Sequence, residues 1–159
     1  MGRFNRYLLA FTTLIFFVPF AQAQEMDGTW KLVMRKLPDG TTVTPPAVLG
    51  AYTIHHGLQN LNVFWHTPEG KHASYARIST YKLSDTDYSE TVLFIALDDG
   101  SGKAPTYNLT GKTETTPVTH QGSRIAFQLP FGEPSAVFEG DKFTATLEGQ
   151  FVDYWERVR

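Results

Sequence analysis

A row of polar side chains at alternate positions is the stretch of this sequence best suited to bind another molecule. Tyr75, Arg77, Ser79 and Tyr81 lie two positions apart, and alternate residues of a β-strand point to the same side of the sheet. On the inside of a protein, this row would present hydroxyl groups and one guanidinium. An arginine removed from water needs an anionic or hydrogen-bonding partner. These residues therefore favour recognition of a polar or anionic group.

The turn at Pro68-Glu69-Gly70 determines which way this row points. Proline presets the first position of a type I turn, and glycine takes the left-handed position that closes a three-residue hairpin loop. This loop pairs His66 with His72 and sets Leu61 opposite Arg77. A change of one residue in the loop would turn Arg77 to solvent. With the apolar residues of the preceding strand facing inwards, the predicted ligand-binding residues are Val63, Trp65, Tyr75, Arg77 and Tyr81.

Several histidines close together in the sequence raise the question of a metal site. His55 and His56 are adjacent, and adjacent residues of a strand point to opposite faces, so we expect their side chains to lie apart. His66 and His72 are expected to be outward-facing cross-strand neighbours, which is fewer ligands than the roughly four of a structural zinc site. We therefore predict no metal ligand and no cofactor. A haem would need only one inward histidine, His56 or His120, and nothing in the sequence favours either.

The sequence offers no convincing catalytic motif. Ser79, His72 and Asp85 could be assembled into a triad, but no nucleophile-elbow motif surrounds the serine. No catalytic residue is predicted. If the protein were an enzyme, Glu90 or Asp153 would be the candidate acid or base inside the fold.

Alternation of apolar and polar residues predicts the strands that would position these side chains. Along residues 29–35, Trp30 and Met34 fall on one face, and Lys31 and Arg35 fall on the other. The same period recurs in residues 52–56, 61–66, 73–83, 88–97, 124–129, 143–147 and 151–158.

Short turns join these segments into a meander. Pro38-Asp39-Gly40 has the same composition as the turn described above, and Gly140-Asp141 suits a two-residue turn that sets Phe138 opposite Phe143. A meander leaves exposed edge strands unless it closes on itself. The predicted fold is therefore all-β, an antiparallel up-and-down β-barrel of about eight to ten strands.

The N-terminal segment predicts export. Two arginines precede an apolar run at residues 7–20, and Ala21-Gln22-Ala23 follows. This is the pattern of a cleaved secretory signal peptide, and the run is shorter than the ~20 apolar residues of a membrane-spanning helix. We predict a signal peptide at residues 1–23 and one β-barrel domain at residues 24–159. The protein is expected to be periplasmic or secreted, without membrane insertion after cleavage.

Charge and cysteine content exclude some partners and one means of stabilisation. The chain has no cysteine, so burial and backbone pairing must stabilise the domain. Two of its 14 basic residues lie in the predicted signal peptide. The chain has 16 acidic residues, which outnumber the basic residues that remain after cleavage. No basic patch remains that would bind nucleic acid or an anionic lipid surface.

The two ends of the predicted domain resemble a known family. Gly28-Thr29-Trp30 is similar to the Gly-x-Trp signature of lipocalins, and residues 28–33 resemble the start of the related intracellular fatty-acid-binding proteins. The resemblance implies a secreted bacterial lipocalin-like domain in which Trp30 plugs the closed end of the barrel. It also implies that a basic residue of the last strand, Arg157, packs across the ring. Gly28, Trp30 and Arg157 are thus predicted to close the barrel, although residues 36–50 are too short for the helical lid of fatty-acid-binding proteins.

The predicted function is binding of a small hydrophobic or amphipathic molecule inside the barrel. For an inward Arg77, the resemblance implies a carboxylate-bearing apolar ligand. Two alternatives remain open from the sequence. The barrel could be filled by its own side chains and act as an interaction or structural module, or it could be an isomerase or cyclase acting on a lipophilic substrate.

Overall fold

The computed structural model describes residues 26–159, which are largely β-strand. The predicted signal peptide at residues 1–23 lies outside the described residues. Within residues 26–159, no helix is long and apolar enough to cross a membrane. The strands are β1 (Gly28–Lys36), β2 (Thr42–Val43), β3 (Val48–His55), β4 (Leu58–His66), β5 (His72–Leu83), β6 (Asp87–Asp98), β7 (Thr106–Asn108), β8 (Thr113–Gln121), β9 (Arg124–Gln128), β10 (Ser135–Glu139), β11 (Lys142–Leu147) and β12 (Phe151–Arg157).

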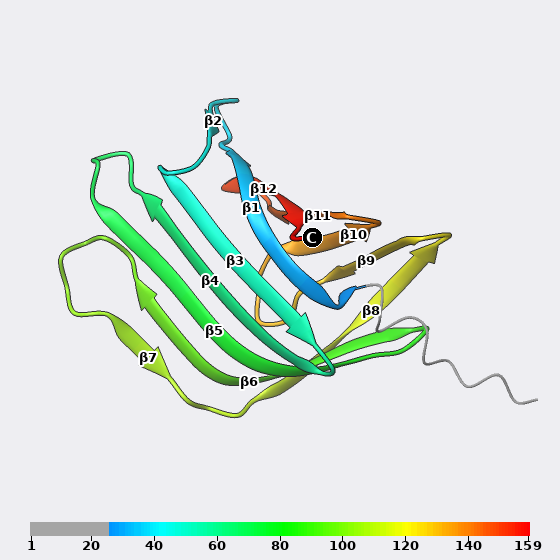
Figure 1. Cartoon of the computed structure of the whole chain (residues 1–159). Coiled ribbons are helices and arrows are strands. Elements are labelled where there is room, and N and C mark those ends of the chain that lie inside the picture. Colours follow the sequence, from blue (N-terminus) through cyan, green and yellow to red (C-terminus); the bar gives the residue numbers. More distant parts are fainter. Residues whose placement is uncertain (1–25) are drawn as a thin grey trace, which may run out of the picture.

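These strands form one antiparallel sheet that closes on itself (Figure 1). Neighbouring strands follow the order β12-β11-β10-β9-β8-β6-β5-β4-β3-β1, and β1 also pairs with β12. The short β2 pairs with the end of β1, and β7 pairs with β6, so both stay outside the closed ring. The structure confirms the predicted all-β up-and-down barrel, which has ten strands.

The hairpin turns give the sheet the register that the sequence predicts. Gly70 has a φ of 75°, the left-handed conformation predicted for it. The ladder between β4 and β5 then pairs Leu61 with Arg77. Between β10 and β11, the turn at residues 140–141 sets Phe138 opposite Phe143. Because these registers are correct, alternation assigns most inward-facing side chains correctly.

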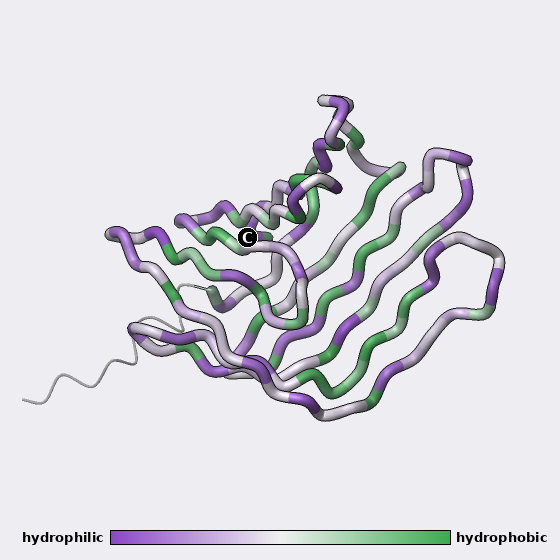
Figure 2. The backbone as a smooth tube through the Cα atoms, turned by 180° about the vertical axis from the view of Figure 1, so that it is seen from behind, coloured by the Kyte–Doolittle hydropathy of each residue, from purple (hydrophilic) through white to green (hydrophobic). Residues whose placement is uncertain are grey.

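The barrel wall alternates between hydrophobic and hydrophilic residues along its strands (Figure 2), but a β-bulge interrupts the alternation in β1. The register of β1 against β12 shifts between Leu32 and Met34. Beyond the bulge, Arg35 is only 8% exposed. The prediction that Arg35 shares the outer face with Lys31 is wrong, because the extra residue of a bulge reverses the facing of the residues that follow it.

Large aromatic side chains fill the end of the barrel where β1 begins and β12 ends. Trp30 is fully buried, and its ring packs edge-on against Phe138 and Phe143 at centroid distances of 5.4 and 6.1 Å. Cζ of Arg157 lies 4.2 Å from the centroid of the Trp30 ring. A Cβ atom on Gly28, which has a φ of 145°, would lie 2.7 Å from Nη1 of Arg157. The three predicted barrel-closing residues therefore lie together at this end.

Candidate functional site

The barrel is hollow at the end opposite Trp30. A cavity of about 820 Å³ lies there, bordered by the turns that follow β1, β4, β9 and β11. Most of its wall is apolar, because alternate residues of the surrounding strands point inwards. The lining includes the apolar residues Val48, Leu61, Val63, Trp65, Phe143, Leu147, Phe151 and Trp155, and the polar or charged residues Arg35, Tyr75, Arg77, Glu133 and Asp153.

Arg77 lies at the base of this cavity, and its side chain is fully buried. Nη1 of Arg77 donates to Oε2 of Glu133, and the Tyr75 hydroxyl donates to Oε1 of the same carboxylate. Nε of Arg77 lies 3.2 Å from Oε1 of Glu90, as an ion pair. Nη2 of Arg77 has no hydrogen-bond partner among residues 26–159. A buried donor without an acceptor is unfavourable, but Nη2 is itself covered by protein atoms, so a bound molecule would reach it only if neighbouring side chains move.

Glu133 reaches Arg77 from the segment between β9 and β10. In this segment Leu129 is buried, and the Phe131 N–H donates to Oε2 of Glu114 on β8 at 3.0 Å. These contacts hold the segment against the barrel, and Glu133 lines the cavity. Sequence analysis missed Glu133. Its position between a glycine and a proline indicates a turn, but a turn does not indicate where its side chains point.

A second layer of buried polar groups holds the Glu90 carboxylate. Oε2 of Glu90 accepts a hydrogen bond of 2.9 Å from the Tyr88 hydroxyl. Nε2 of Gln59 donates to the Tyr88 hydroxyl oxygen and to Oγ of Ser79, both at 2.8 Å, and Oε1 of Gln59 accepts from the Tyr52 hydroxyl. Because each group is held by another, the carboxylate beside the guanidinium is fixed in position.

Burial sets the protonation states at the base of the cavity. It raises the pKa of Glu133 above the ordinary value of 4.5, although Arg77 and Tyr75 partly oppose the shift. It also raises the pKa of Tyr75, so the hydroxyl remains a donor. Burial disfavours the charged form of Arg77, but Glu133 and the other neighbouring groups outweigh this effect and raise the arginine pKa. A permanent cation therefore lies beside a carboxyl group that takes up a proton more readily than an exposed one.

A second buried ion pair lies in the cavity wall. Nε and Nη2 of Arg35 donate to the two carboxylate oxygens of Asp153 at 2.6 and 2.7 Å. Cζ of Arg35 lies 4.1 Å from the ring centroid of Phe151 and 5.4 Å from that of Trp65. The guanidinium is thus held by one carboxylate and two rings, and it adds a planar polar surface to an otherwise apolar wall. Burial raises the pKa of Asp153, while Arg35 opposes the shift.

Most of the predicted ligand-binding residues lie at the cavity, and one lies elsewhere. Val63, Trp65, Tyr75 and Arg77 line the cavity. Tyr81 is buried but is not part of the lining; its hydroxyl donates to Oδ1 of Asp27 at 2.9 Å, at the closed end. Alternation predicts which side chains of a strand point into the barrel, but it does not predict how far along the barrel axis each of them lies. β5 is 12 residues long. It therefore reaches from the cavity to the closed end.

The closed antiparallel barrel of ten strands is compatible with a lipocalin-like fold. We compared the chain with models of protein families, with curated proteins and with solved structures, and none of the three comparisons gave a match.

Proposed function

We propose that this protein is an exported, lipocalin-like binding protein that holds one small amphipathic molecule in its barrel. The observation that carries this proposal is the cavity of about 820 Å³, with its largely apolar wall and with Arg77 at its base. Cavities of roughly 300–1,000 Å³ that combine an apolar wall with a few polar groups are typical of small-molecule sites. The size supports a ligand of the dimensions of a fatty acid or a similar lipid.

The wall and the base favour different parts of such a ligand. An apolar chain would bury surface against Leu61, Val63 and Phe143, and this burial is the main driving force for binding. The head group would approach Arg77, whose buried Nη2 atom has no acceptor among residues 26–159, and contact would require the side chains that cover the guanidinium to move. A carboxylate is the acceptor that best matches the charge and the planar shape of a guanidinium.

Glu133 makes a carboxylate ligand possible despite the two acidic groups around Arg77. A third carboxylate would leave excess negative charge in a buried site, which is costly. Because burial already raises the pKa of Glu133, this residue can take up a proton as the ligand binds. Uptake of a proton by the protein is thus part of the proposed binding reaction.

The two alternatives have weaker support. Side chains fill the closed end of the barrel but leave the other end hollow. For an enzyme, Glu90 is fully buried and is not part of the cavity lining, and Asp153 is held by Arg35 through both carboxylate oxygens.

The test is to measure binding of palmitic acid, and of the alcohol with the same chain, to lipid-free protein by calorimetry. Ala145→Phe puts a large ring into the cavity lining, and Ala51→Phe on the exposed face of β3 is the matched control. We expect Ala145→Phe to weaken binding of palmitic acid by at least ~10-fold, which is about 1.4 kcal/mol. The control should bind like the wild type. Equal binding by both variants, or no binding by the wild type, would contradict the proposal.

The head group is tested with Arg77→Met, which keeps an apolar stem and removes the guanidinium. Palmitic acid should lose at least ~10-fold in affinity, whereas the alcohol should lose much less, because a charged partner contributes more to an arginine contact than a neutral one. Arg77→Gln, which removes the positive charge but keeps a hydrogen-bond donor, serves if the first variant does not fold. Equal losses for both ligands would remove Arg77 from head-group recognition.

The intact mass of protein purified from its own host tests export, because cleavage after Ala23 removes residues 1–23.

A further inference from the structure

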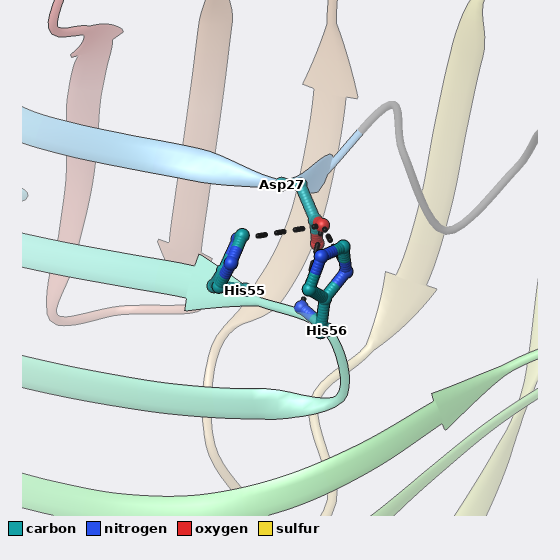
Figure 3. A group of neighbouring side chains, drawn as sticks. All are labelled: Asp27, His55 and His56. Atoms are coloured by element: carbon teal, nitrogen blue, oxygen red, sulfur yellow. Dashed lines mark hydrogen bonds and ion pairs between the residues drawn. The ribbon is translucent and has the colours of Figure 1, made fainter.

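A group of metal-ligating side chains lies at the closed end of the barrel, away from the cavity. Asp27 precedes β1, while His55 and His56 lie at the end of β3 and in the turn that follows it. Figure 3 shows the carboxylate facing both imidazole rings. Each residue offers one ligand atom, and these atoms lie within 4.8 Å of one another.

The backbone of the turn between β3 and β4 brings the two histidines together. His56 has a φ of 47° and Gly57 a φ of 82°, so both adopt left-handed conformations. The expectation that adjacent histidines point to opposite faces is wrong here, because it holds only for two residues in extended conformation. The rings instead lie side by side, with centroids 4.0 Å apart.

The carboxylate of Asp27 is held in place by other parts of the barrel. Its Oδ1 accepts a hydrogen bond of 2.9 Å from the hydroxyl of Tyr81, a buried residue of β5. Its Oδ2 accepts a hydrogen bond of 3.3 Å from the backbone N–H of His56. Oδ2 also lies 3.9 Å from Nδ1 of His55 and 3.6 Å from Nδ1 of His56. One oxygen is thus anchored, and the other faces both imidazoles.

These separations are close to those of a coordinated ion. Two atoms that each lie about 2.1 Å from a tetrahedral ion are about 3.4 Å apart. The histidine side chains are 70% and 76% exposed, so small rotations can bring their nitrogen atoms to this distance. Imidazole and carboxylate groups suit Zn²⁺ and Cu²⁺.

We propose that Asp27, His55 and His56 form a binding site for one divalent transition-metal ion of the Zn²⁺ or Cu²⁺ type. Three protein ligands leave a coordination position for water or for a group from another molecule. The site requires no ligand in the barrel, so it is independent of the proposed carrier function.

The test is titration of the protein, without a histidine tag, with Zn²⁺ in a non-chelating buffer by calorimetry. The wild type should bind one equivalent with an affinity in the micromolar range, and the ion should raise the melting temperature, because it binds only the folded site. Asp27→Asn, His55→Ala and His56→Asn should each weaken binding by at least ~10-fold. Asparagine is chosen at position 56 because it tolerates a positive φ.

His72→Ala is the matched control, because His72 is also an exposed histidine whose ring lies 4.9 Å from a second histidine, His66. It should bind Zn²⁺ like the wild type. Absence of binding by the wild type, binding that survives all three site variants, or loss of binding in the control would overturn the proposal. Circular dichroism of each variant shows whether a loss of binding reflects a loss of fold.

Discussion

The guanidinium of Arg157 covers the indole of Trp30, with Cζ 4.2 Å from the ring centroid. The two residues are direct partners in the ladder that joins β1 to β12, so the contact lies on the seam that closes the barrel. Nε1 of Trp30 donates to the carbonyl oxygen of Met26 at 3.0 Å, which satisfies the only polar atom of the buried ring. A ring and a cation from opposite ends of the domain thus close one end of the barrel.

Trp30→Ala should destabilise the protein by about 3–5 kcal/mol, the usual cost of deleting a large buried aromatic side chain. The measurement is the free energy of unfolding in urea at neutral pH. Trp65→Ala is the control, because Trp65 is only partly buried in the cavity wall, and it should cost clearly less. A loss below about 1 kcal/mol for Trp30→Ala, as at surface positions, would mean that the ring does not close the barrel.

The same two strands carry two ion pairs that differ in burial. Arg35 and Asp153 have side chains 9% and 4% exposed, while Lys31 and Glu156 are 58% and 53% exposed. Arg35→Ala should cost about 3–5 kcal/mol in urea unfolding, because it leaves a buried carboxylate without its partner. Lys31→Ala should cost less than about 1 kcal/mol, as is typical of exposed pairs. Similar losses for the two variants would contradict the inward position of Arg35.

Much of the fold is predictable because local chemistry determines it. The turn residues around Gly70 and Gly140 set the register, and alternation then assigns the side of each strand. The bulge in β1 carries no glycine or proline signal between Leu32 and Met34. It arises from the fit of β1 to β12, which are joined only in the folded barrel, so local pattern gives Arg35 the wrong face.

The candidate site is less predictable than the fold. The inward orientation of Arg77 and Tyr75 is predicted by the register of the hairpin between β4 and β5. Glu133 belongs to a segment without strand periodicity, and the path of this segment depends on the assembled barrel. His55 and His56 are also predicted wrongly from local pattern. Adjacent residues of a strand point to opposite faces, but His56 has a positive φ because it belongs to the turn, and its side chain therefore lies beside that of His55. Functional side chains in this protein are missed where the backbone departs from regular strand geometry.

The burial of Glu133 should make the stability of the protein depend on pH in a defined direction. In the unfolded chain Glu133 titrates near its ordinary pKa of 4.5, and burial raises this pKa in the folded protein. Between these two values, the folded state holds a proton that the unfolded chain has released. The contribution of Glu133 to the free energy of unfolding therefore falls as the pH rises through this interval.

Glu133→Gln removes this titration and keeps the size of the side chain. When the pH is lowered towards the ordinary glutamate pKa of 4.5, the wild type should gain stability relative to the variant, because the folded protein binds the proton before the unfolded chain does. Urea unfolding at several pH values measures the difference. Asp153, whose pKa burial also raises, titrates in both proteins and cancels. Glu148→Gln, at an exposed turn, should follow the wild-type profile. Parallel profiles for wild type and Glu133→Gln would show that Glu133 is not buried against Arg77, and the proposed proton uptake on binding of a carboxylate ligand would lose its basis.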